Sequence, residues 1–312
     1  MRHLLVSLMC SGLLCAGSDW VLLRTTEEIQ MEAQADISAL RTNGAILSFH
    51  NGAAPSDKEK ERIQSGIAAI QGADRAARDA AVEELTSIGL PVITPLLAAL
   101  KDTDQHEPRP LYRLFERVIP SDADGIDRTL SLLRLETGKS VRVATPSGSL
   151  EVRKHDGSKT VLPWSSVRSL AVRKKLIRRQ MEVHSLRHCT QIEYLDTGVA
   201  ITAASKVDLT AAGFVRLSWN EDGWATDANG LTKPGSAAYK TNLVAGHPFG
   251  ALVGRIGARG EVFFVGKKAT KTGLPAGRLT LAVNDNAHWQ NNLGTYRVTM
   301  TSTDSYDLGW AQ

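Results

Sequence analysis

The sequence predicts a multidomain α plus β protein, with a helical region first, a small β module next and an all-β sandwich last. Three observations support this. Apolar residues recur at helical spacing between positions 75 and 102. Short alternating segments, bounded by Gly, Pro, Asn and Asp, begin near residue 129. From residue 183 onwards, roughly eight such segments follow one another, which is typical of a sandwich or jelly roll.

Residues 1–18 have the pattern of a secretory signal peptide. Basic Arg2 precedes the apolar residues 4–14, and small residues follow. We therefore predict a secreted or periplasmic protein whose mature chain starts near Asp19, with a lipid anchor on Cys15 as the second choice. No run elsewhere is long and apolar enough to predict a transmembrane segment.

Cys189 is the only cysteine after this segment, so no internal disulfide is expected in the mature chain. Its stability then depends on hydrophobic cores or on a bound ion. The length of 312 residues indicates two or three domains, and the composition is ordinary for a globular protein.

Residues 24–120 are predicted to form a helical region. Thr25 and Glu28 have the spacing of a capping box, and apolar residues at helical spacing follow up to Leu40. After the turn-rich stretch HNGAAPSD, a second helix is expected over residues 58–70.

The stretch RAARDAAVEELTSIGLPVITPLLAALKD contains the strongest pattern. Gly89 is expected to end one helix and Pro91 to begin the next. Two apolar stripes would face each other, formed by Ala77, Ala81, Val82 and Leu85 and by Ile93, Leu96, Leu97 and Leu100. This pair resembles one HEAT-type helical repeat, which implies a module for partner contacts. The chain shows no long array of such repeats, so no large groove is expected.

Residues 129–180 are predicted to form a small basic module like an SH3 or Sm barrel. Twelve Lys or Arg and three Asp or Glu between Arg134 and Arg179 give a local net charge of +9. The densest part contains Arg173, Lys174, Lys175, Arg178 and Arg179. An anionic envelope polymer or a membrane surface fits a secreted protein. A solvated basic linker is an equal alternative, and nucleic acid is not expected because exposed aromatic residues are scarce here.

Residues 183–312 contain the candidate strands TQIEYL, TGVAIT, KVDLTAAG, FGALVGRIG, VFFVG, RLTLAV and TYRVTM. The last two flank VNDNAHWQNNLG, which we interpret as a hairpin loop. It holds Asn284, Asp285, Asn286, Asn291 and Asn292. Such side chains are common in turns, because they tolerate left-handed backbone conformations. They also supply the oxygen ligands that calcium prefers.

Four stretches of this region resemble the calcium-dependent galactophilic lectins of the PA-I-type bacterial family. They are DTGVAITAASKVDLTAAGFVRLSW, HPFGALVGRIG, VFFVG and GRLTLAVNDNAHWQNNLGTYRV, between residues 196 and 298. The resemblance implies a galactose-binding-like jelly-roll sandwich that binds carbohydrate with Ca²⁺. Carried over residue by residue, the metal ligands are Asp285, Asn291, the backbone carbonyl of Asn292 and the carbonyl of Leu217 or a neighbour. Sugar hydroxyls then complete the shell.

The sequence departs from the family pattern in the middle of this loop. The loop is one residue shorter, and His288 or Ala287 stands where the family has a threonine. The family's His-Pro-x-Gln motif is also absent, so the sugar stays open. For the sugar site we predict Asp285, Asn291, His288 and Trp289, because an aromatic face stacks on the apolar side of a pyranose. Trp219 and Trp224 are alternatives. One or two of the three tryptophans, Trp219 first of all, are expected to close the core instead.

We predict that the protein is not an enzyme. The chain has no G-x-S-x-G, no H-E-x-x-H and no phosphate loop. His184 and His188 precede an expected strand, on which they would not share a face as a metal pair does. The predicted function is therefore secreted carbohydrate binding. The alternative is a cell-envelope interaction scaffold in which the sandwich is structural, and an enzyme of unrecognised type ranks third.

Overall fold

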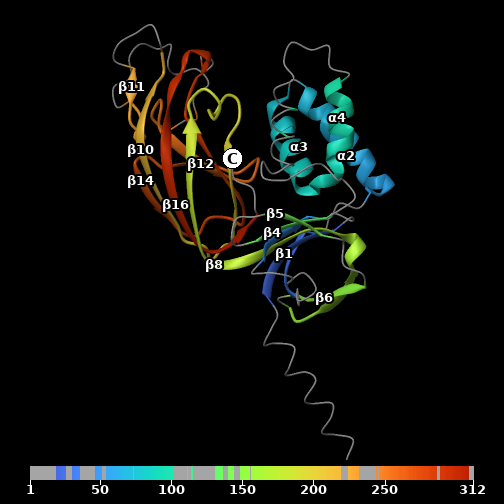
Figure 1. Cartoon of the computed structure of the whole chain (residues 1–312). Helices are drawn as coiled ribbons and strands as arrows, with labels where there is room; N and C mark the ends of the chain where they lie inside the picture. Colours follow the sequence, from blue (N-terminus) through green and yellow to red (C-terminus); the bar gives the residue numbers. More distant parts are fainter. Residues whose placement is uncertain are drawn as a thin grey trace, which may run out of the picture. The chain divides into compact units, whose positions relative to one another are not determined.

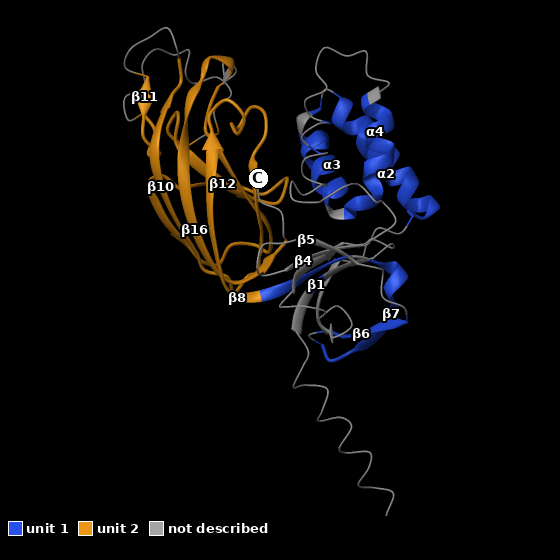
Figure 2. Ribbon diagram, viewed as in Figure 1, with its two compact units in different colours: residues 1–173 blue, residues 174–312 orange. Residues whose placement is uncertain are grey.

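The computed structural model is mostly β, with a curled antiparallel sheet and a few helices (Figure 1). It describes residues 19–25, 30–35, 46–50, 54–72, 74–101, 111, 114, 131–135, 140–143, 148–154, 156–218, 224–231, 244, 246–286 and 289–308. The chain divides into two compact units, residues 1–173 and 174–312 (Figure 2). The predicted signal peptide lies outside the described residues.

Unit 1 contains a small helical core. Its elements are α2 (Asp57–Gln71), α3 (Arg75–Ile88), η2 (Leu90–Val92) and α4 (Ile93–Lys101). Gly89, at a φ of 77°, ends α3 just before Pro91, and the chain bends by 115° there. The two predicted helices and their corner are thus confirmed, whereas the HEAT-type resemblance stays a prediction. No single helix in the described part of the chain is long and apolar enough to cross a membrane, and the bent pair passes that test only together.

Unit 1 also contains a sheet. Its strands are β1 (Asp19–Thr25), β2 (Gln30–Ala35), β3 (Ile46–His50), β4 (Ser131–Leu135), β5 (Ser140–Val143), β6 (Ser149–Arg153) and β7 (Lys159–Pro163). The predicted helix beginning near Thr25 is wrong, because β1 and β2 pair antiparallel, with Asp19 opposite Ala35. Strand pairing overrides the helical spacing here, since β preference depends on cross-strand partners. The predicted β module therefore shares its sheet with β1, β2 and β3, and the SH3-like assignment stays a prediction.

β8 (Val167–His184) crosses the boundary between the two units. Its first residues pair with β1, with Val172 opposite Val21. Further on, Ile177, Met181 and Val183 are buried in the hydrophobic core of unit 2. The boundary between the two compact units along the chain thus falls within β8, between Arg173 and Lys174, whereas the sequence-based division lies between residues 180 and 183.

Unit 2 is all-β. Its further strands are β9 (Leu195–Ile201), β10 (Val207–Arg216), β11 (Ala225–Thr226), β12 (Leu252–Ile256), β13 (Val262–Phe264), β14 (Lys268–Lys271), β15 (Gly277–Val283) and β16 (Leu293–Asp307). The predicted segments coincide with these strands except TQIEYL, where residues 190–192 form a turn. One layer has the order β13-β12-β15-β9, and in the other β16 lies between β8 and β10. Alternate side chains of both layers, such as Leu281 and Val298, form the core between them.

The connection from β15 to β16 is not a hairpin, and the sequence-based interpretation was wrong on this point. β9 lies between β15 and the end of β16, because Thr280 pairs with Asp196 and Tyr306 pairs with Ala200. The first part of β16 pairs instead with β10 in the other layer. Residues 284–292 therefore pass from one layer to the other at one end of the sandwich.

Candidate functional site

Asn284 fixes the start of this connection. It is fully buried, and its Oδ1 accepts a hydrogen bond from the Val244 amide at 3.0 Å. Its Nδ2 donates to the carbonyls of His247 and Pro248, each at 3.1 Å. Both polar atoms of the side chain are thus used inside the protein, so Asn284 positions the loop.

The backbone of Asp285 is held by the turn that follows β8. Its amide donates to Thr190 Oγ1 at 3.0 Å, and its carbonyl accepts from Thr190 Oγ1 at 3.1 Å and from Gln191 Nε2 at 2.9 Å. The side chain is 1% exposed. Its Oδ1 accepts from the Asn286 amide at 2.6 Å, and its Oδ2 contacts Asn292 Nδ2. The clamp therefore directs a buried carboxylate at Asn292.

Asn292 is also 1% exposed, and its amide group is only half satisfied. Nδ2 donates to the Ser185 carbonyl at 3.1 Å and reaches the Asp285 carboxylate. Oδ1 is buried and has no hydrogen-bond partner within the described part of the chain. A buried carbonyl oxygen without a donor costs free energy, which a hard cation bound there would recover. A carboxylate beside an orphaned amide oxygen fits calcium, which prefers oxygen ligands.

The other predicted metal ligands lie close to this pair. Arg216, the last residue of β10, is opposite Leu293, the first residue of β16, so the next residues of the chain, Leu217 and Asn292, lie at the same end of these strands. Leu217 is buried. Asn291 is half-buried at the end of η5 (Trp289–Asn291). The structure thus brings Asp285, Asn292 and Leu217 to one end of the sandwich, with Asn291 beside them in the chain.

The predicted sugar-binding residues in the middle of the loop fall mostly outside the described part of the structure. Ala287 and His288 lie outside the described residues, as does Trp219. Trp289 belongs to η5 by its backbone. Trp224 packs edge-on against Phe249, with ring centroids 5.7 Å apart, at the border of the core. Trp224 therefore packs at the border of the core, whereas the core position expected first for Trp219 stays a prediction.

Sequence reasoning missed the residues that brace the loop, namely Ser185, Thr190 and Gln191. They lie in the turn between β8 and β9, and Thr190 is 95 positions from Asp285. Ser185 donates from both its amide and its hydroxyl to the Gly294 carbonyl, at 3.1 and 3.0 Å. No local pattern marks these residues, because their partners are distant in the sequence. The sequence TQIEYL predicted a strand at the place where this turn forms.

Tyr296 holds a second loop against the same end of the sandwich. Its hydroxyl lies 2.8 Å from the carbonyl of Asp227, 2.9 Å from that of Gly250 and 3.3 Å from that of Thr226. Burial raises the pKa of Tyr296, and the negative charge of Asp227 raises it further. The hydroxyl therefore stays protonated, and its one hydrogen can be donated to any one of these three carbonyls. Gly250 in turn donates its amide to the Asn284 carbonyl at 2.7 Å, so Tyr296 and Asn284 support each other.

The basic run from Arg173 to Arg179 lies entirely on β8. Lys175 and Arg178 are exposed, whereas Ile177 between them is buried. Arg179 forms an ion pair with Asp307 at 2.5 Å, and both side chains are largely buried. The run joins the two units as part of a continuous strand, and Ile177 contributes to the core of unit 2, so the solvated part of the predicted linker is limited to its exposed residues. Binding to an anionic surface stays a prediction.

No protein-family model matches the sequence, and no curated protein matches it. One solved structure to which the chain is similar is the N-terminal domain of EclA, a PllA-like lectin. The two share 26% identity at a TM-score of 0.31, and the match covers 40% of this chain and 96% of that one.

Proposed function

We propose that this protein binds carbohydrate through a calcium ion held at the β15–β16 connection. The observation that carries the proposal is the buried Oδ1 of Asn292, which lacks a hydrogen-bond partner in the described part of the chain and lies beside the Asp285 carboxylate. The resemblance of the sequence to calcium-dependent lectins implies a ligand set in the same place.

In this proposal Asp285 supplies the one negative charge of the protein shell. Asn292 Oδ1, the side chain of Asn291 and the carbonyl of Leu217 supply neutral oxygens. Here the proposal departs from the resemblance, which implied the backbone carbonyl of Asn292, because the orphaned atom belongs to its side chain. When bound, calcium accepts sugar hydroxyls at the positions that the protein leaves open. The protein side chains hold and orient the ion and catalyse no reaction.

The transition-metal alternative has little support. Within the described residues, no group of three or more His, Cys, Asp and Glu is placed to hold a metal ion. The His184 amide donates to His188 Nδ1 at 3.1 Å, so one nitrogen of this imidazole is already used in the turn. We propose secretion or a periplasmic location from the N-terminal pattern alone.

The first test is the melting temperature of the full chain with calcium and with chelator. An ion that binds only the folded state stabilises it by about 2.7 kcal/mol at a hundredfold excess over Kd. We expect a rise of several degrees that chelator reverses, and its loss in Asp285→Asn. The matched control is Asp156→Asn, an exposed turn carboxylate that accepts from the Ser158 amide at 2.8 Å.

A melting temperature that changes neither with millimolar calcium nor with chelator would exclude the proposed calcium site. The interaction scaffold with a structural sandwich would then become the better function. If calcium binds, a neutral and acidic glycan array probed with and without calcium tests the second half of the proposal. Sugar binding that is equal in both conditions would contradict calcium bridging.

A further inference from the structure

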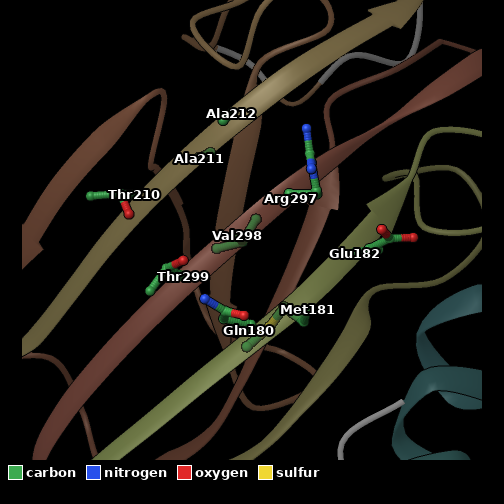
Figure 3. Close-up of a pocket in the computed structure, with 9 residues that line it drawn as sticks. All are labelled: Gln180, Met181, Glu182, Thr210, Ala211, Ala212, Arg297, Val298 and Thr299. Carbon is green, nitrogen blue, oxygen red and sulfur yellow. The ribbon is translucent and has the colours of Figure 1, made fainter.

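A groove of about 460 Å³ lies on the outer face of the sheet formed by β8, β16 and β10. Figure 3 shows its lining residues on these three adjacent strands. The exposed ones are Gln180, Glu182, Thr210, Ala212, Arg297 and Thr299. Sites that hold small ligands occupy about 300–1,000 Å³, so the groove has the size of a binding site.

Strand register places these side chains in rows across the sheet. Thr210 is opposite Thr299, and Ala212 is opposite Arg297. Met181 and Val298, which alternate with them, point into the hydrophobic core. The groove therefore lies on the opposite side of the sheet from the core.

The polar groups of the groove suit a ligand with many hydroxyls and no net charge. Within the described residues, the side chains of Gln180, Thr210, Arg297 and Thr299 form no hydrogen bond or ion pair with one another or with other groups. Glu182 and Arg297 are the only charged residues in the lining, and their charges are opposite. An anionic polymer would gain little from such a balanced surface, whereas amide, hydroxyl and guanidinium groups all bond to sugar hydroxyls.

An exposed aromatic ring continues the groove along β10. Phe214 is 68% exposed and stands on the same face as Thr210 and Ala212, opposite Thr295. Two residues along a strand span about 7 Å, so the ring lies just beyond the Ala212 row. An aromatic face stacks on the apolar side of a pyranose ring, which gives the exposed Phe214 ring a use in sugar binding.

We propose that this groove is a second binding site, for a neutral oligosaccharide chain. Phe214 is the stacking platform, and Gln180, Thr210, Arg297 and Thr299 bind the hydroxyls of neighbouring sugars. The site needs no metal ion and shares no residue with the Asp285 site, so it stands whether or not calcium binds there.

The experiment uses the full chain in the presence of a chelator, which removes any bound calcium. Isothermal titration calorimetry measures binding of neutral linear hexasaccharides of glucose, mannose, galactose or xylose. At least one is expected to bind with an affinity that does not depend on salt, since no net charge is involved. Phe214→Ala and Arg297→Ala should each weaken it about tenfold. The matched controls Val161→Ala, exposed on β7, and Arg259→Ala, exposed in a turn, should leave it within about twofold.

Three results would overturn the proposal. The first is that no hexasaccharide binds in chelator, and the second is that binding is unchanged in both groove variants. The third is a protein that is dimeric by light scattering and becomes monomeric in Phe214→Ala, because the face would then be an interface between copies. Phe214 and Arg297 are exposed, so unchanged melting temperatures are expected and confirm that the variants fold.

Discussion

Two segments of the sequence are candidates for binding, and the fold brings the polar residues of one together while it separates those of the other. In the connection 284–292, polar residues several positions apart converge, and Asp285 and Asn292 meet as buried side chains. In the basic run 173–179, adjacent residues separate, because a strand sends successive side chains to opposite faces. Ile177 enters the core, Arg178 is exposed, and Arg179 pairs with Asp307.

These two segments show that charged or polar residues clustered along the sequence do not necessarily form a cluster on the surface. A run of cations on a strand divides its charge between two faces, and part of that charge is then neutralised by partners. A loop that links two layers can instead bring its polar residues together, since both of its ends are fixed by distant elements. For binding sites, the position of a segment between elements therefore matters more than its local composition.

The largest expected effect tests whether the basic run is a core strand. Ile177→Ala should lower the free energy of unfolding by about 2–5 kcal/mol, because it leaves a cavity among buried side chains. Its neighbour Leu176, 47% exposed on the other face, is the matched control, and Leu176→Ala should change it by less than about 0.5 kcal/mol. Urea unfolding of both variants measures the difference. Equal effects would mean that β8 does not alternate between core and solvent.

The second prediction concerns the brace of the loop. Thr190→Val removes the hydroxyl that both accepts from the Asp285 amide and donates to its carbonyl. A buried amide loses its acceptor, so we expect a loss of about 1–3 kcal/mol and a smaller calcium-induced rise in melting temperature. Thr301→Val, half-exposed on β16, is the control. A calcium response equal to wild type would show that Thr190 supports only the fold.

The smallest expected effect is the binding of the basic run to an anionic surface. Only part of the run is exposed, so vesicles with phosphatidylserine should bind weakly at low ionic strength. Binding should disappear near physiological salt, because the screening length falls from about 30 Å at 0.01 M to about 8 Å at 0.15 M. Co-sedimentation measures this, with Lys175→Gln plus Arg178→Gln as the variant that removes two exposed charges. Binding that persists at high salt would contradict an electrostatic contact.

The sequence by itself determined the features that depend on local chemistry. Gly89 and Pro91 mark the helix corner, and the alternating segments of unit 2 coincide with strands. The Asp and Asn residues of the loop were recognisable in the same way, since Asp285 and Asn292 lie in one short stretch.

The tertiary structure alone decided where these elements go. β2 is a strand because β1 pairs with it, despite helical spacing. The loop joins two layers because β9, from far earlier in the chain, pairs with β15. Thr190 clamps Asp285 across 95 positions, and the groove gathers residues from β8, β10 and β16. Such partners are fixed by long-range pairing and burial, which no local spacing encodes.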